Sequence, residues 1–436
     1  MTSTGFDSLL NSDSAEDSLA AVADSGRELQ ELISPISAEE FVNSYFARES
    51  LYVQGTPHKF DHIFSWKKLQ QAIATGQNIP DRRYNMTASF ARGEVSGSPR
   101  RMIEAYHDQI AELLQAGATI CITNIHMADP VLSRWARAIR AQLNFSGTVG
   151  VNCYISPDGA GLPMHYDKRV ATTLQLAGKK RWRFSTGPAK AWPSHNALYQ
   201  QGRVEPVGVD PGKLPADMEF REVELNPGDL LCLPAGTWHA AQGVGDSFAI
   251  NLFFAPRNFL GQLLPLLQQF ADSNADWRGG PPATVEEIGG GMPGTISEYM
   301  RERLDEFHRM ALENLDGPDA LIEPWLISLT HDPYTGWRPV PKSAPRQLTA
   351  EQRFRVAVPS PRLVEYRDRV MLPCDHGVLK FPVSAAPVLR RLAAESGAFS
   401  VDDVLAWREG PDEPAPNEVL SCLMALIENG IVEAAG

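Results

Sequence analysis

The sequence lacks the apolar runs and basic leader segments that direct proteins into or across membranes. No stretch of about 18 apolar residues occurs, which is the length that a membrane-spanning helix needs. The first 26 residues contain no Lys or Arg, whereas a secretory signal starts with a basic segment and a mitochondrial presequence is rich in arginine. We therefore expect a cytoplasmic protein without a membrane partner.

Cysteine is also scarce. Five cysteines occur in 436 residues, and no two of them form a Cys-x-x-Cys pair. Disulfide frameworks and zinc sites need paired, closely spaced cysteines. The odd total and the wide spacing therefore predict buried thiols rather than either kind of site, at Cys121, Cys153, Cys232, Cys374 and Cys422.

Positive charge is in deficit. The chain has 40 Lys and Arg against 53 Asp and Glu, a formal net charge of −13. Residues 376–436 contain four basic side chains against nine acidic ones. Phosphate backbones attract the opposite sign of charge, so we expect no DNA binding.

The chain changes in character along its length, and at 436 residues it is long enough for two or three domains. Residues 1–30 are rich in Ser, Asp and Ala and are expected to be flexible. Between 147 and 255, short apolar segments alternate with Pro and Gly turns, which predicts strands of an antiparallel sandwich or barrel. Helical patterns predict helices at 103–116, 131–143, 259–270 and 297–315, and a compact α/β unit with three more helices from residue 376 onward.

The informative residues are His165 and Asp167, together with the distant His239. Side chains at i and i+2 of an extended segment point to the same side. A second imidazole from another strand would complete one face of a metal and leave the opposite positions open, as in non-haem Fe(II) oxygenases. The alternatives are three unrelated polar residues on a sheet, or a fold that has lost its metal.

The surroundings of these residues resemble the cupin motifs. Gly228, Pro234, Gly236 and His239 stand at the spacing of the second cupin motif. The first motif carries His-x-Asp, as in the branch that includes the JmjC oxygenases. The segment 152–184 closely resembles the ribosomal oxygenases, which are JmjC-type 2-oxoglutarate-dependent hydroxylases, and is similar to the asparaginyl hydroxylase that acts on hypoxia-inducible factor. The resemblance implies a mainly β core, a double-stranded β-helix of the jelly-roll (cupin) type with flanking α-helices.

The resemblance also implies cofactors and the residues that hold them. Fe(II) would be bound by His165, Asp167 and His239, with 2-oxoglutarate as co-substrate and O2 as oxidant. In the relatives, a cation fifteen residues after the first histidine pairs with the C5 carboxylate of 2-oxoglutarate, and here this position is Lys180. Asn152 and Asn251 are candidate co-substrate contacts. The asparaginyl hydroxylase has an asparagine where this chain has Ala171, so the partner of the C1 carboxylate stays open.

The family's organisation implies four parts for this chain. Residues 1–30 form the flexible acidic N-terminus and residues 31–256 the oxygenase domain. Residues 257–350 correspond to a helical dimerisation region, which implies a homodimer, and residues 351–436 to a winged helix.

By resemblance, the protein hydroxylates a side chain of a polypeptide, with Arg or His of a ribosomal protein favoured. A net charge of −13 suits such a basic substrate. The same chemistry on a ribosomally made peptide natural product, or demethylation of an N-methyl group, stays open. The alternative from another class is a non-catalytic cupin that binds a ligand or a partner.

Overall fold

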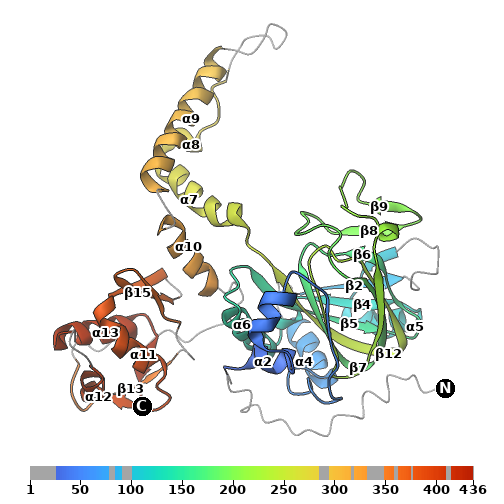
Figure 1. Ribbon diagram of the computed structural model, residues 1–436, viewed down its shortest axis with the longest axis horizontal. Helices are drawn as coiled ribbons and strands as arrows, with labels where there is room; N and C mark the ends of the chain where they lie inside the picture. The colour runs from blue at the N-terminus through green and yellow to red at the C-terminus, as the bar shows by residue number, and fades with distance from the viewer. Residues whose placement is uncertain are drawn as a thin grey trace. The chain divides into compact units, whose positions relative to one another are not determined.

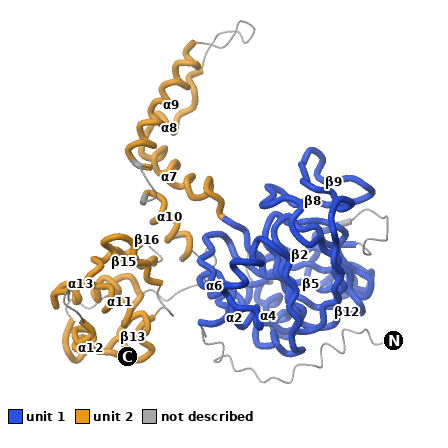
Figure 2. Tube along the Cα trace, in the orientation of Figure 1, with its two compact units in different colours: residues 1–256, 334–336 blue, residues 257–333, 337–436 orange. Residues whose placement is uncertain are grey.

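The computed structural model (Figure 1) describes residues 26–77, 84–90, 101–283, 294–315, 319–330, 348–357, 362–374, 377–408 and 414–435. The chain forms two compact units, one up to Pro256 and one from Arg257 onward (Figure 2). Most of residues 1–30 lie outside the described residues. Helix α2 (Glu28–Ile33) begins inside that segment, so the prediction of a flexible stretch is wrong for its last residues. The reason is burial of Leu29 and Ile33 in the core of the first unit.

The first unit is built on one 12-stranded sheet in which every described pairing is antiparallel. Its main path runs in the order β1-β11-β7-β12-β5-β4-β2-β3, and β6, β8, β9 and β10 pair off this path. The strands are β1 (Leu51–Val53), β2 (Asn85–Phe90), β3 (Arg101–Glu104), β4 (Thr119–Thr123), β5 (Thr148–Ser156), β6 (Gly161–Tyr166), β7 (Val170–Ser185), β8 (Ala197–Gln200), β9 (Arg203–Glu205), β10 (Phe220–Leu225), β11 (Leu230–Leu233) and β12 (His239–Ala255). The predicted β core is confirmed.

Two long central strands, β7 and β12, carry most of the pairing. They are 16 and 17 residues long, and their register shifts between Val244 and Ala249. Gly178 lies in this region with φ +61°, and a Cβ there would lie 1.8 Å from the carbonyl oxygen of Asp246. A register shift of this kind bends the strands, and the close approach of the two backbones requires a glycine.

Helices cover the sheet with amphipathic faces. The best defined is α6 (Pro130–Gln142), which matches the helix predicted at 131–143. Asp129 caps it by accepting a hydrogen bond from the Leu132 amide at 2.7 Å, and Trp135 and Ile139 enter the core. The other helices of this unit are α3 (Ala38–Glu40), the π-helix η1 (Phe41–Tyr45), α4 (Trp66–Gln77) and α5 (Ile110–Gln115), with single 3-10 turns η2 (His107–Gln109), η3 (Ile125–Met127) and η4 (Pro215–Asp217).

The helix predicted at 103–116 is wrong in its first half. Residues 101–104 form β3, in which Ile103 pairs with Ala88 of β2, and only α5 is helical beyond the turn. A short apolar run fits the period of a helix and that of a strand equally well. Here the pairing with β2 makes the segment a strand.

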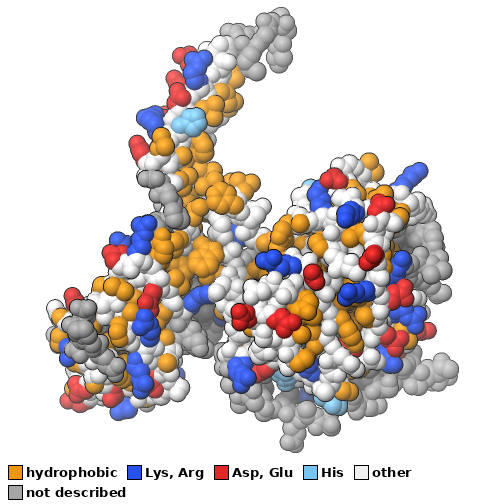
Figure 3. All heavy atoms as spheres, viewed as in Figure 1, with side chains coloured by type: hydrophobic (Ala, Val, Ile, Leu, Met, Phe, Trp, Pro, Cys, Tyr) orange, Lys and Arg blue, Asp and Glu red, His pale blue; other side chains and the backbone are white. Residues whose placement is uncertain are grey.

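The second unit begins with four helices: α7 (Phe259–Ser273), α8 (Ala275–Arg278), α9 (Gly294–Asn314) and α10 (Asp319–Thr330). Large apolar side chains of α7 and α9 are exposed, including Phe259, Leu264 and Leu304. Figure 3 shows hydrophobic side chains along these helices. None of the described helices is both long enough and apolar enough to cross a membrane.

The C-terminal part has its own core, formed by small sheets and three helices. Its elements are β13 (Arg353–Val356), β14 (Val364–Tyr366), β15 (Arg369–Cys374), β16 (Gly377–Pro382), the 3-10 turn η5 (Val383–Ala385), α11 (Ala386–Ala393), β17 (Phe399–Ser400), α12 (Val401–Ala406), α13 (Pro416–Glu428) and β18 (Val432–Ala434). The three predicted helices are present, and Ser400 caps α12 as its pattern with Asp403 predicted. The assignment of this part as a winged helix stays a prediction.

Candidate metal and co-substrate site

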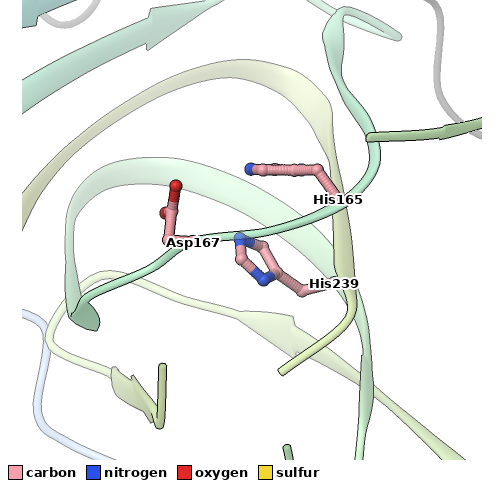
Figure 4. A group of neighbouring side chains, drawn as sticks. All are labelled: His165, Asp167 and His239. Carbon is pink, nitrogen blue, oxygen red and sulfur yellow. The ribbon is translucent and has the colours of Figure 1, made fainter. Parts of the chain in front are cut away.

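The structure brings His165, Asp167 and His239 together. His165 lies near the end of β6, Asp167 follows that strand directly, and His239 opens β12, where it pairs with His165 in register. One ligand atom from each side chain lies within 4.8 Å of the others, and Figure 4 shows the three side chains side by side. The arrangement offers two imidazoles and one carboxylate from two neighbouring strands.

The backbone fixes both imidazoles in one tautomer. His165 Nδ1 lies 2.7 Å from the Pro163 carbonyl oxygen, and His239 Nδ1 lies 2.8 Å from the Thr237 carbonyl oxygen. A carbonyl only accepts, so each Nδ1 carries a hydrogen, and in the neutral ring Nε2 is then the nitrogen with the lone pair. Burial lowers the pKa of His239, against the opposing charge of Asp167. A neutral imidazole is the form that binds a metal.

The loop before β12 holds Asp167 in place. Gly236 donates its amide hydrogen to the carbonyl oxygen of Asp167 at 2.8 Å. Gly236 has φ +82°, and a Cβ there would lie 1.9 Å from the Lys190 carbonyl oxygen. The glycine of the second motif thus has a steric reason, because a larger residue would push this loop away from the carboxylate.

Lys180 lies on β7 and is 4% exposed. Its Nζ lies 5.6 Å from the centre of the Tyr154 ring, and burial lowers the pKa of its ammonium group to about 8. Its neighbours Lys179 and Arg181 point outward, where both approach Glu224 at 3.2 and 3.8 Å. Strand alternation therefore sends one cation of the three inward.

Asn152 and Asn251 face each other across β5 and β12. The side-chain oxygen of Asn152 accepts from the Asn124 amide at 3.1 Å. The side-chain nitrogen of Asn251 donates to the Thr173 hydroxyl at 3.1 Å. Both asparagines are buried and have protein partners, so each of them also supports the pocket wall.

The sequence reasoning missed Tyr154. It lies two residues after Asn152 on β5, so period-2 alternation was the signal that could have found it. Burial raises the pKa of the Tyr154 phenol, Asp167 raises it further, and Arg169 opposes the shift. The phenol therefore lies close to a residue of the triad as well as to Lys180.

The aromatic residues near the site differ in position. Tyr166 is buried and packs on Trp238 with ring centres 4.5 Å apart. Trp182 is also buried, and its ring centre lies 5.8 Å from that of His239. It therefore forms part of the wall behind that imidazole. Four of the five thiols are buried, and Cys121 is partly exposed.

Comparisons with known proteins identify the domain. The model of a family described as the JmjC domain matches residues 126–260. Residues 126–260 are thus similar to the JmjC domain. This range includes the triad, Lys180 and both asparagines.

Two of the curated relatives of this chain have oxygenase or hydroxylase names. "Ribosomal oxygenase 1" of Gallus gallus is 29% identical over 279 residues, which cover 61% of this chain and 44% of that protein. "Bifunctional lysine-specific demethylase and histidyl-hydroxylase NO66" of Drosophila persimilis is 24% identical over 283 residues, which cover 58% of this chain and 39% of that protein. "Uncharacterized protein YxbC" of Bacillus subtilis is 24% identical over 253 residues, 55% of this chain and 74% of its own length. The chain spans less than half the length of the two named oxygenases.

Solved structures share the fold. Escherichia coli ribosomal oxygenase YcfD aligns with a TM-score of 0.51 at 14% identity, over 92% of this chain and 98% of that one. A second structure of YcfD, in complex with cobalt and 2-oxoglutarate, aligns with a TM-score of 0.51 at 15% identity, over 92% and 99% of the two chains. The predicted cupin-type fold and the predicted resemblance to the JmjC domain are confirmed.

The residues of this site fit a divalent metal and 2-oxoglutarate. Two imidazole nitrogens and one carboxylate are the donor set of a facial Fe(II) site. A buried ammonium group, which has no ion pair among the residues that the structure describes, suits one end of a dicarboxylate.

Proposed function

We propose that the protein is an Fe(II)- and 2-oxoglutarate-dependent hydroxylase of a polypeptide side chain. The observation that carries the proposal is the cluster of His165, Asp167 and His239, together with the buried Lys180 beside Tyr154. Burial of an unpaired ammonium group lowers the stability of the fold, so a lysine without a ligand would be more stable at the protein surface. Binding of a carboxylate ligand would explain why Lys180 is buried.

Each side chain then has a role. His165, Asp167 and His239 would hold the metal, and Lys180 would pair with the C5 carboxylate of 2-oxoglutarate. Asn152, Asn251 and Tyr154 would shape the wall against which the co-substrate lies. When bound, iron and 2-oxoglutarate supply the oxidation of a substrate C–H by O2, with succinate and CO2 as the other products. The chain itself binds, orients and keeps water away.

The substrate that we favour is a ribosomal protein, modified on Arg or His. The names of the Gallus gallus and Escherichia coli relatives support this class of substrate. A net charge of −13 would also attract a basic protein. A ribosomally made peptide is the second candidate of the same chemistry, and lysine demethylation is part of the name of the Drosophila relative. A cytoplasmic location fits each of these substrates.

We also propose that the helices of residues 257–350 form a homodimer. Phe259, Leu260 and Leu264 of α7 are 68%, 56% and 52% exposed, and Leu304 of α9 is 58% exposed. Covering such side chains stabilises an association of two copies. Light scattering should give twice the mass of the chain, and a monomeric mass would contradict this part. The C-terminal winged helix would then contact protein, since its acidic charge disfavours DNA.

The proposed activity is tested by binding first. The purified protein is titrated anaerobically with Fe(II) and then with 2-oxoglutarate, and the weak visible charge-transfer band of the chelate is followed. His239→Ala should remove the band, while the exposed His195→Ala should leave it unchanged. A folded wild-type protein without a band under any iron loading would favour the non-catalytic cupin that binds a ligand or partner.

A further inference from the structure

A second cation, Arg169, stands beside the metal site. It follows Asp167 by two residues, in the turn between β6 and β7. Its guanidinium carbon lies 4.0 Å from the centre of the Phe253 ring, which is a close stacking contact. Phe253 is buried, so the ring gives the guanidinium group a fixed support.

This support lies on the pocket side of the sheet. Phe253 stands two residues after Asn251 on β12, so the two side chains share one face. Asn251 faces Thr173 and contacts its hydroxyl, and Phe253 pairs with Ala171. The charge of Arg169 also acts on the Tyr154 phenol, as does that of Asp167. The guanidinium group, two residues after Asp167 in the sequence, therefore lies against the sheet face that carries Asn251.

The guanidinium group has no carboxylate of its own there. Within the described part of the chain, Arg169 makes no ion pair or hydrogen bond, and its guanidinium group stacks on the Phe253 ring. By contrast, Lys179 and Arg181 on the outer face approach a glutamate. A planar guanidinium that is held on one face and has its N–H groups free suits a carboxylate, which it can bind through two parallel hydrogen bonds.

We propose that Arg169 is a carboxylate-binding residue at the metal site, a role that rests on the proposed function. The carboxylate has two sources. One is the C1 carboxylate of 2-oxoglutarate, because Ala171 has no polar side-chain atom that could hydrogen-bond to it. The other is an acidic group of the polypeptide next to the residue that is modified. The second source would make the enzyme select a carboxylate within an otherwise basic partner.

Two measurements on Arg169→Gln separate the sources, with Lys168→Gln as the matched control. Lys168 is exposed, and its substitution removes the same charge one residue away. In the first, the Fe(II)-loaded proteins are titrated anaerobically with 2-oxoglutarate. Loss of a charge-assisted hydrogen bond should weaken binding about 10- to 100-fold if Arg169 holds the C1 carboxylate. Arg169→Lys should recover part of this affinity.

In the second measurement, the proteins are offered two pools of short random peptides with amidated C-termini. One pool contains Asp and Glu, and the other has Asn and Gln in their place. If the carboxylate belongs to the polypeptide, wild type and Lys168→Gln should enrich the acidic pool, and Arg169→Gln should lose this preference while its 2-oxoglutarate affinity is unchanged.

Arg169→Gln that matches wild type in both measurements would overturn the inference. A wild-type protein that forms no chelate with Fe(II) and 2-oxoglutarate is a different failure, because it removes the proposed function itself. The peptide measurement, made without metal, still decides whether Arg169 binds carboxylates in that case.

Discussion

Two amphipathic helices, α6 of the first unit and α7 of the second, show how differently the two units use apolar residues. In α6, Leu132, Trp135 and Ile139 are buried against the sheet. In α7 no residue is fully buried, and Phe259, Leu260 and Leu264 are more than half exposed. The apolar face of α6 is covered by other parts of the same unit, whereas the apolar side chains of α7 stay exposed among the residues that the structure describes. The stability of the triad's surroundings therefore depends on the first unit, and the proposed homodimer would depend on the second.

The largest effect on stability is expected from a substitution in the buried face of α6. Trp135→Ala should lower the unfolding free energy of the first unit by about 3–5 kcal/mol, because it removes a large buried side chain and leaves a cavity. Leu264→Ala of α7 should change the stability of the monomer by less than about 0.5 kcal/mol. Native-state hydrogen exchange, measured where light scattering finds monomer, reports each unit separately. Equal losses would mean that α7 is packed as α6 is.

Lys180 offers the next largest effect, with opposite signs for binding and stability. Lys180→Met should abolish detectable binding of 2-oxoglutarate, and it should stabilise the ligand-free protein by about 1–4 kcal/mol because a buried charge is replaced by an apolar side chain. The outward Lys179→Met should change neither quantity appreciably. Calorimetric titration and thermal unfolding give the two values. A destabilised Lys180→Met protein would show that the ammonium group has a structural partner.

The same residue predicts a dependence on pH. Burial lowers the pKa of Lys180 to about 8, and only the ammonium form binds a carboxylate. Affinity for 2-oxoglutarate should thus fall up to about tenfold per pH unit above 8. The stability of the ligand-free protein should rise over the window from 8 to the usual lysine pKa of about 10.4, since the unfolded chain then binds more protons. A pH-independent affinity in this window would place the carboxylate elsewhere.

The sequence was sufficient for the features that are local. The strands predicted between 147 and 255 include β5, most of whose residues are buried. The triad follows from the spacing of His165 and Asp167 and from the glycine loop before His239, both of which are set within a few residues. Lys180 is directed inward by the alternation of one strand.

Features that depend on residues far apart in the sequence could not be predicted from it. Ile103 fits a helix by period and becomes a strand residue because β2 lies beside it. Arg169 lies in a turn, where alternation gives no direction, and Phe253, which supports it, is 84 residues away in the sequence. Tyr154 carried a local signal, but its nearness to Lys180 results from the pairing of β5, β12 and β7.

The smallest effect on stability is expected from loss of a helix N-cap, and α6 and α7 have the same kind of N-cap. Asp129 accepts from the Leu132 amide at 2.7 Å, and Asn258 accepts from the Gly261 amide at 2.9 Å. Asp129→Ala should lower the stability of the first unit by about 1 kcal/mol. Asn258→Ala should increase only the local opening of the first turn of α7. Because α7 has no buried residues, the lost cap should not lower the stability of the rest of the unit. Hydrogen exchange distinguishes the two, and protection lost throughout the second unit in Asn258→Ala would mean that α7 is an integral part of its core.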